Sequence, residues 1–433
     1  MLALLLALTV AAPDTLKLTL ADAFALARRH SPDLVQADAA RAQGGITLAR
    51  GIAGLIPSVA ATLGYGREDL GASIPESLRL TGWEWSGSLG LSQVVFDPSA
   101  FTGLAAAVAG AGSQRADARD REARLLYDVT ADYLGLLRSG LLREASAAAL
   151  ARAEENLRIA EEMRHLGSAS EIDVLRSSVF KSQADIELLQ ADKAVAVARA
   201  TFAATVGLER DVFVRPVESL PGPADAPPPF AELHAAIQRS NPGLEIARRA
   251  RSAADIGCLA AWGRALPGVS AYWTSSWADS ALPRGIGGWT DRDVRTWGIR
   301  ATFPLLDFKT WILGIADAGN ESRRARAAAR AAELQLNSSA TAALLGYEEA
   351  IETWQLAGRS LELSQRLHEL AREQRRLGSI TLADFFGVEA DLARARATLT
   401  GSLCDTYIQA ARINYLLGVT DAPGTGEDVD ERR

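Results

Sequence analysis

A short turn motif that occurs twice constrains the fold of this chain more than any other feature. Its copies are residues 164–173 (RHLGSASEID) and 375–384 (RRLGSITLAD), and each interrupts a long segment rich in Ala, Leu, Glu and Arg. Leu-Gly-Ser is typical of a helix end, because Gly readily takes the left-handed conformation there. Ser170 or Thr381, with an acid three residues later, is typical of a capping box that begins the next helix. The motif predicts two helical hairpins with matching tips.

The tips belong to a duplication of nearly the whole chain. Ser31-Pro32-Asp33-Leu34 corresponds to Asn241-Pro242-Gly243-Leu244, 210 positions later, and the two tip glycines are 211 positions apart. We expect the first repeat at 18–215, a Pro-rich linker at 216–229, the second repeat at 230–420 and a disordered acidic tail at 421–433.

Both repeats predict the same elements: a helix broken at a proline, two strands, a long helix, and a return helix after the tip. The expected helices are 20–56, 98–165 and 170–206 in the first repeat, and 230–266, 309–376 and 381–417 in the second. A helix of nearly seventy residues is about 100 Å long. That length favours side-by-side coiled-coil packing over a compact core.

Apolar and polar residues alternate in four segments of about ten residues, as in the strands of transmembrane β-barrels. The apolar positions include tryptophans that suit an aromatic belt at the membrane boundary, namely Trp83, Trp85, Trp273, Trp277 and Trp297. The polar positions are expected to line a lumen, and include Ser86, Ser88, Ser270, Thr274 and Arg300. The alternative is a soluble sheet with a Trp-rich core packed on helices.

Four strands cannot close a barrel, and an open edge in lipid would leave backbone groups unpaired. Three copies would supply twelve strands, enough for a ring with an open lumen. The expected fold is therefore mainly α with a small transmembrane β part. In it, a trimer forms a twelve-stranded β-barrel that continues into an α-helical barrel.

Composition and motifs exclude several functions. The net charge of −7 argues against nucleic acid as a partner. Residues 1–12 (MLALLLALTVAA) are typical of the apolar part of a secretory signal, although no Lys or Arg precedes them, so the signal is expected to be incomplete. The four histidines share no metal-ligand spacing, and there is no nucleophile elbow or phosphate loop. We expect no enzymatic activity, metal or cofactor.

The chain resembles the TolC-like outer-membrane efflux protein family from Leu18 to about Val419. The resemblance rests on an ordered set of motifs: Leu20-Ala21-Asp22-Ala23, Ser31-Pro32-Asp33-Leu34, the strand end Gln93-Val94-Val95-Phe96-Asp97, and both tips with their downstream Asp. It implies a homotrimer in the lipid of the outer membrane that extends through the periplasm. The implied partners are a periplasmic adaptor (membrane fusion) protein and an inner-membrane pump of the RND or ABC type.

The resemblance also implies roles for the tips. The residues that would dock the adaptor are Leu166, Gly167, Ser168, Leu377, Gly378 and Ser379. Asp173 and Asp384 would narrow a closed periplasmic gate, with simple helix capping as the alternative for both. Gly387 stands where some family members carry a second Asp, so a double carboxylate ring is not implied.

The leading hypothesis is a passive outer-membrane exit duct of a tripartite efflux or type I secretion system. The alternative is a soluble periplasmic coiled-coil adaptor or scaffold. Adaptors usually have one hairpin per chain, and they lack paired amphipathic strands at matching places. The sequence does not identify the cargo.

Overall fold

The computed structural model describes residues 15–66, 83–208, 213–216, 229–279, 293–303 and 308–420. The expected signal segment at 1–12, most of the linker at 216–229 and the tail at 421–433 lie outside the described residues. None of the described helices is long and apolar enough to cross a membrane.

The chain falls into two compact units, and each unit takes parts of both repeats. We call them the hairpin unit, which comprises Met1–Ala39, Asp117–Gly243 and Glu333–Arg433, and the sheet unit, which comprises Ala40–Ala116 and Leu244–Ala332. The duplication therefore does not divide the protein into two separately folded halves.

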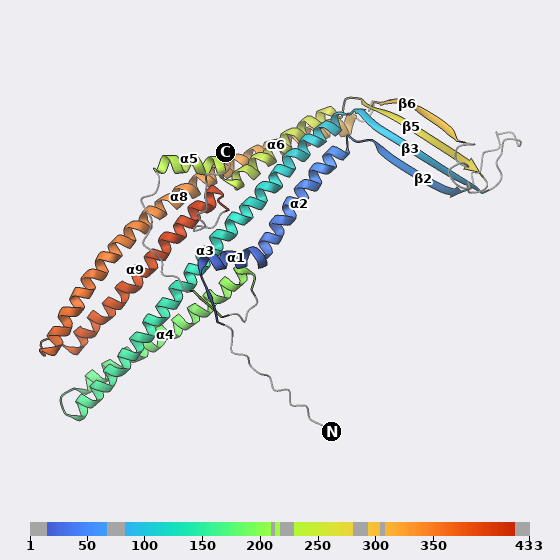
Figure 1. Ribbon diagram of the computed structural model, residues 1–433. Helices are drawn as coiled ribbons and strands as arrows, with labels where there is room; N and C mark the ends of the chain where they lie inside the picture. The colour runs from blue at the N-terminus through green and yellow to red at the C-terminus, as the bar shows by residue number, and fades with distance from the viewer. Residues whose placement is uncertain are drawn as a thin grey trace, which may run out of the picture. The chain divides into compact units, whose positions relative to one another are not determined.

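Both repeats contain the expected elements in the expected order (Figure 1). The first forms α1 (Leu20–His30), α2 (Pro32–Ala53), β2 (Ser58–Gly66), β3 (Glu84–Phe96), α3 (Pro98–His165) and α4 (Glu171–Val206). The second forms α5 (Phe230–Ser240), α6 (Pro242–Gly263), β5 (Gly268–Asp279), β6 (Val294–Thr302), α8 (Phe308–Arg376) and α9 (Leu382–Leu417). Two short strands that the sequence analysis missed, β1 (Thr15–Leu18) and β4 (Phe213–Pro216), pair in parallel.

The predicted breaks near Pro32 and Pro242 are confirmed. Each proline is the first residue of a helix, where its missing N–H would have had no partner in any case. The residues before them, Ser31 and Asn241, have extended backbone and end α1 and α5. Proline restricts the preceding residue to this extended region, so the helix must stop there.

The core of the hairpin unit lies where α1, α3 and α4 meet. Tyr133 of α3 and Phe202 of α4 are fully buried, with ring centroids 6.2 Å apart. The Tyr133 hydroxyl donates to the backbone carbonyl of Leu18 at 3.0 Å, so its polar end is satisfied. Fully burying a large apolar side chain contributes about 1.5–3 kcal/mol. This cluster anchors the start of the described chain to the long helices.

Contacts between side chains identify the neighbouring helices in the hairpin unit. Thr205 of α4 donates to Asp132 of α3, and Arg138 of α3 pairs with Asp405 of α9 at 3.2 Å. The hydroxyl of Thr406 on α9 reaches a backbone carbonyl of α8 at 3.4 Å. The helices are therefore neighbours in the order α4–α3–α9–α8. The two outer helices, α4 and α8, come from different repeats.

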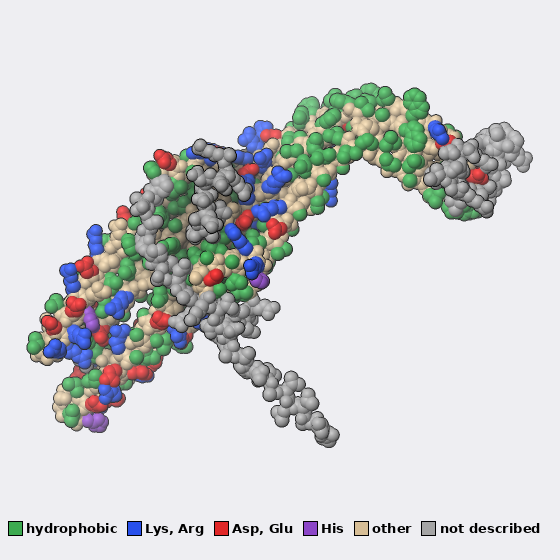
Figure 2. All heavy atoms as spheres, in the orientation of Figure 1, with side chains coloured by type: hydrophobic (Ala, Val, Ile, Leu, Met, Phe, Trp, Pro, Cys, Tyr) green, Lys and Arg blue, Asp and Glu red, His purple; other side chains and the backbone are tan. Residues whose placement is uncertain are grey.

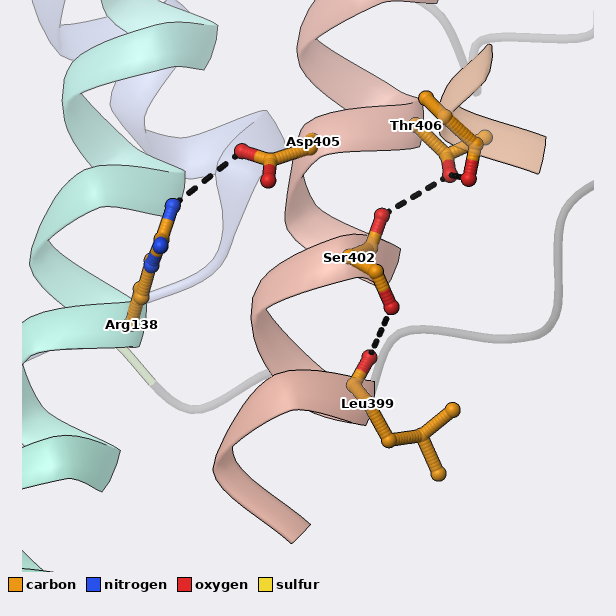
Figure 3. Close-up of polar contacts among 6 residues, drawn as sticks. Arg138, Leu399, Ser402, Asp405 and Thr406 are labelled. Carbon is orange, nitrogen blue, oxygen red and sulfur yellow. Dashed lines mark hydrogen bonds and ion pairs between the residues drawn. The ribbon is translucent and has the colours of Figure 1, made fainter. Parts of the chain in front are cut away.

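Figure 3 shows the contact between α3 and α9. The guanidinium of Arg138 reaches Asp405, and a Cβ placed on Gly401 would lie 3.4 Å from its Nε. Ser402 and Thr406 donate their hydroxyls to carbonyls of α9 itself, each at 2.9 Å. Because both members of the ion pair are about half exposed, the pair is worth no more than about 1 kcal/mol.

Four antiparallel strands form one sheet in the order β2–β3–β5–β6, seen side by side in Figure 1. All nine residues of β2 are exposed, and so are all but one of the residues of β6. Neither face of these edge strands is covered by the described part of the chain. A soluble sheet packed on helices would bury one face, and none of the described helices covers either face of these two strands.

The glycines that end α4 and α9 are expected to tolerate no side chain. Gly207 and Gly418 have φ of +78° and +70°. A Cβ on Gly207 would overlap the carbonyl oxygen of His30, and one on Gly418 would lie 2.8 Å from Cδ of Pro242. We predict that Gly207→Ala or Gly418→Ala destabilises the protein by roughly 1–3 kcal/mol, measured as a lower thermal unfolding midpoint by circular dichroism.

Gly135 is the matched control, because it lies inside α3 with open space around its Cα. Gly135→Ala should leave the midpoint unchanged or raise it, since Ala favours a helix by about 0.5–1 kcal/mol over Gly. Equal midpoints for all three variants would contradict the packing described above.

Candidate functional site

The two hairpin tips have the same backbone geometry. Gly167 and Gly378 have φ of +74° and +71°. The N–H groups of the following residues, Ser168 and Ser379, each donate at 2.9 Å to the carbonyl five residues earlier. The serine hydroxyls donate to the same carbonyls. This left-handed helix end is the arrangement that the Leu-Gly-Ser motif predicted.

The leucines of the motif form the most exposed apolar surface of each tip. Leu166 and Leu377 are 83% and 81% exposed. The backbone bonds of the turn fix the position of each leucine without burying it. Burial of one such side chain against another protein would contribute about 1.5–3 kcal/mol. Each tip therefore presents an exposed leucine on a turn whose backbone is fixed by hydrogen bonds.

Asp173 and Asp384 both cap the helix that follows their tip. Ser170 donates its hydroxyl and its backbone N–H to the Asp173 carboxylate at 2.7 and 3.0 Å, which completes a capping box. Thr381 donates its hydroxyl to Asp384 at 2.6 Å and accepts from the Asp384 N–H at 3.1 Å. The hydrogen bonds from Ser170 hold the pKa of Asp173 below its ordinary value. Both carboxylates stay exposed, so capping leaves them accessible from solvent.

Side chains, unlike the backbone, differ between the tips. In the second tip the Arg375 guanidinium lies 4.6 Å from the ring centroid of the buried Phe385. His368 lies 6.0 Å from the same ring and 3.7 Å from the Glu389 carboxylate. The first tip has an exposed ion pair instead, in which Arg164 and Glu171 are 3.6 Å apart. This cluster was not predicted from the sequence, although the Phe-Phe pair after the second tip could have indicated it.

The register of the sheet sorts the strand residues onto two faces. Directly paired residues of antiparallel strands share a face. Trp85, Leu89 and Leu91 pair with residues of β2 and β5 that place them on one face with Trp273, Trp277 and Trp297. The other face carries the five polar positions predicted to line a lumen: Ser86, Ser88, Ser270, Thr274 and Arg300. The predicted alternation therefore holds across all four strands.

Contacts on the polar face run between strands. The hydroxyls of Thr62 and Ser88 are 2.6 Å apart, and the guanidinium of Arg300 lies 4.6 Å from the ring centroid of Tyr272. These contacts hold polar side chains together without burying them. A face of small hydroxylated residues suits contact with water.

Aromatic rings gather on the apolar face near one end of the strands. Tyr65 lies 5.3 Å from Trp83 and 4.7 Å from Trp85, between ring centroids. Trp277 covers Gly87, where a Cβ would lie 2.6 Å from the indole. Trp83 lies just before β3 rather than within it.

A second aromatic pair escaped the sequence analysis because it lies on helices. Trp262, near the end of α6, and Trp311, near the start of α8, meet edge to face at 6.1 Å. Both helix ends adjoin the strands, so aromatic residues flank the sheet at both ends of its strands. A search for tryptophan beside the predicted strands, rather than within them, would have found this pair.

Comparisons with known proteins agree with this geometry. The family model described as outer membrane efflux protein matches residues 24–208, which is nearly all of the first repeat. The first repeat is thus similar to the outer membrane efflux protein family, and the whole chain has the fold of solved outer-membrane channels. The resemblance found in the sequence is thereby confirmed.

Solved outer-membrane channels share the fold along almost their full length. The CmeC outer membrane channel of Campylobacter jejuni is 14% identical with a TM-score of 0.80, covering 92% of this chain and 85% of that one. VceC of Vibrio cholerae is 16% identical with a TM-score of 0.77, covering 92% and 96%. The open-state MtrE channel of Neisseria gonorrhoeae is 15% identical with a TM-score of 0.73, covering 92% and 88%. None of the curated proteins matches the sequence significantly.

The first capping box should make the start of α4 sensitive to pH. Because the folded-state pKa of Asp173 is lowered, its stabilisation is complete above the unfolded value and is lost as the pH falls through the folded value. We predict that Asp173→Asn speeds hydrogen exchange in the first turn of α4 at neutral pH, because it removes the charged acceptor of the Ser170 hydroxyl and N–H. The difference from the wild type should disappear in acid, once the pH falls below the lowered pKa of Asp173.

Hydrogen exchange with mass spectrometry, corrected for the intrinsic rate at each pH, measures this difference. The start of α9 provides an internal reference, since Asp173→Asn leaves Thr381 and Asp384 intact. A difference between variant and wild type that persists at low pH would contradict the role of the Asp173 carboxylate.

Proposed function

We propose that this protein is one third of a passive exit duct in the outer membrane, through which a periplasm-spanning efflux or type I secretion system releases its substrates. The similarity of the first repeat to the outer membrane efflux protein family and the channel fold of the whole chain support this function. The observation that carries the proposal is the open sheet, whose two edge strands are exposed along their length.

The sheet has two different open edges, β2 and β6. In lipid, unpaired backbone groups cost several kcal/mol each, so these edges require partners. Pairing β2 of one copy with β6 of the next is a head-to-tail contact, and such contacts form rings when the rotation closes. Three copies in a ring give twelve strands and leave no edge.

The hairpin unit has two different open sides as well. The free side of α4 bears exposed apolar residues that follow one another after three, four or seven positions: Ile172, Leu175, Val179, Ile186 and Leu189. The free side of α8 bears Leu356, Leu363 and Leu370, each seven residues from the next and each at least 60% exposed. These are coiled-coil seams without a partner in the described part of this chain. Packing α4 of one copy on α8 of the next closes the helical layer. The copies then follow one another in the same order around the ring as they do when β2 pairs with β6.

The two faces of the sheet suit lipid and water. On the face that Figure 2 shows, hydrophobic side chains cover much of the strand-bearing end of the sheet unit, and charged side chains gather over the helices. In the ring, the apolar face with Trp85, Leu89 and Trp297 contacts lipid, with aromatic residues at both boundaries. The polar face with Ser88 and Thr274 lines the water path.

The tips carry the contact with the rest of the system. We assign the docking of a periplasmic adaptor to the Leu-Gly-Ser motif of both tips, because its leucines are exposed on a rigid turn. An inner-membrane pump of the RND or ABC type supplies the energy. Asp173 and Asp384 remain available to narrow the entrance, since their carboxylates stay exposed while they cap.

We predict that an arginine on the apolar face of the sheet prevents assembly. Leu89→Arg or Leu91→Arg would place a charge in the hydrocarbon, at a cost of about 2–4 kcal/mol at mid-depth. Thr274→Arg, on the opposite face, is the matched control and should assemble. Trimer yield in detergent-solubilised outer membranes, read from gel mobility, measures this. Equal yields for both faces would contradict the assignment of lipid and water.

We predict that changes at the tips abolish export without affecting the trimer. Gly167→Pro and Gly378→Pro break the left-handed helix end, and Leu166→Glu with Leu377→Glu charges the surface but keeps the turn. Val35→Glu, which alters an exposed apolar residue of α2, is the control. Export in a host that depends on this duct is the measurement. Wild-type export by the double glutamate variant would remove the docking role of the leucines.

A further inference from the structure

We propose that the duct carries a belt of arginines below the membrane that attracts anions, so that negatively charged substrates are the cargo class it favours. The inference rests on the proposed duct and concerns the helical part of the sheet unit. Its helical stretches 40–53, 98–116, 244–263 and 308–332 contain eleven Lys or Arg and only four Asp or Glu. The whole chain has a net charge of −7, so this part is strongly basic in an acidic protein.

Contacts fix the order of the helices in this unit. A Cβ on Gly51 of α2 would lie 2.5 Å from Ala107 of α3, and one on Gly263 of α6 would lie 2.9 Å from Pro98 of α3. Asp255 of α6 accepts hydrogen bonds from α8, from the hydroxyl of Ser322 at 2.6 Å and the guanidinium of Arg326 at 3.0 Å. The helices are neighbours in the order α2–α3–α6–α8, which is also the order of the strands that join them.

This layer of helices is curved. On α6, Gly263 faces α3 and Asp255 faces α8, and eight residues of helix separate these directions by about 80°. On α3, Ala107 faces α2, whereas Gly112 and Pro98, which contact α6, lie about 140° and 180° around the helix from it. A flat layer would require about 180° at each helix, so the layer bends at α6. Viewed from the sheet, the narrow side at α6 lies on the same side of the layer as the 140° side of α3, and this face is therefore concave.

Arginines project from the concave face of three helices. Arg115 of α3 lies between the directions of its two neighbours, about 80° from Ala107 and about 60° from Gly112. Arg41 lies on α2, about 60–100° around the helix from the residues that face α3. Arg323 lies on α8, at a similar angle from the residues that face α6. In both helices the rotation is toward the concave face. Arg248 of α6 lies beside Asp255, at the seam with α8. All four side chains are exposed.

The four arginines also lie at similar distances from the sheet. Arg41 precedes the end of α2 by 12 residues, Arg115 follows the start of α3 by 17, and Arg248 and Arg323 are each 15 residues from the strand-proximal end of their helix. At 1.5 Å per residue these distances are about 18–26 Å. Residues at one level on one concave face form a belt, and a ring of three chains would close that belt around the water path.

A belt of guanidinium groups selects by charge. Rings of Arg or Lys are how pores favour anions and phosphates, since guanidinium groups remain charged at every physiological pH. Field lines focus inside a narrow path with low-dielectric walls, which raises the local concentration of the attracted ion. Carboxylates, phosphates and sulfates are the groups that this belt recognises.

The test is ion selectivity of the full-length trimer in a planar bilayer with a KCl gradient. The variant carries Arg115→Gln and Arg323→Gln, both on the concave face. The matched control carries Arg50→Gln and Arg264→Gln, which remove the same charge from exposed positions on the opposite, convex face. We expect the wild type and the control to prefer Cl⁻ over K⁺. The permeability ratio should fall about two-fold or more in the concave-face variant.

The outcomes separate this inference from the proposed function. A conducting wild type without anion preference, or equal permeability ratios for the two variants, would overturn the arginine belt and leave the duct intact. A folded trimer that inserts into the bilayer and passes no current would instead contradict the duct itself. Loss of anion preference in the control alone would place the selective charges on the other face and overturn the belt as assigned.

Discussion

The unpaired hydrogen-bonding groups along β2 and β6 are the constraint on which the rest of this structure depends. A four-stranded sheet cannot curl far enough to pair its own edges, and lipid offers no water to satisfy them. Both edges are exposed in the single chain, and they are different strands. In the duct proposed above, further copies in a head-to-tail ring satisfy both edges, and a ring imposes an open centre. The proposed water path thus follows from the pairing of backbone groups rather than from a cavity within one chain.

The helices, like the strands, form a layer with two different open edges. In the hairpin unit the order α4–α3–α9–α8 leaves two different helices with open apolar seams. In the sheet unit the order α2–α3–α6–α8 follows the strand order, because each helix continues directly from a strand or into one. A wall that is one helix thick buries little on its own. In the proposed ring, the next copy covers the exposed leucines of this layer.

Duplication produced two tips with one backbone and two sets of side chains. The two Leu-Gly-Ser turns have the same backbone hydrogen bonds and nearly equal glycine φ values. Around them, the second tip packs Arg375 on Phe385, whereas the first has an exposed ion pair. The two tips therefore share one backbone shape but differ in the side chains around it. In the duct proposed above, this difference would let a partner distinguish the two hairpins while binding both turns in the same way.

Sequence alone determined the elements and their faces. Proline at 32 and 242, glycine at 167 and 378 and the alternation in the strands act through local geometry, and the helices and strands begin and end within a few residues of the predicted positions. The tertiary structure decided the features that depend on contacts between distant segments of the chain. Only the packing revealed the β1–β4 pair, Trp262 against Trp311, Arg375 over Phe385, and the side of each helix from which an arginine projects. Periodicity records which residues share a face, but the partner that a face meets is set by contacts between segments far apart in the chain.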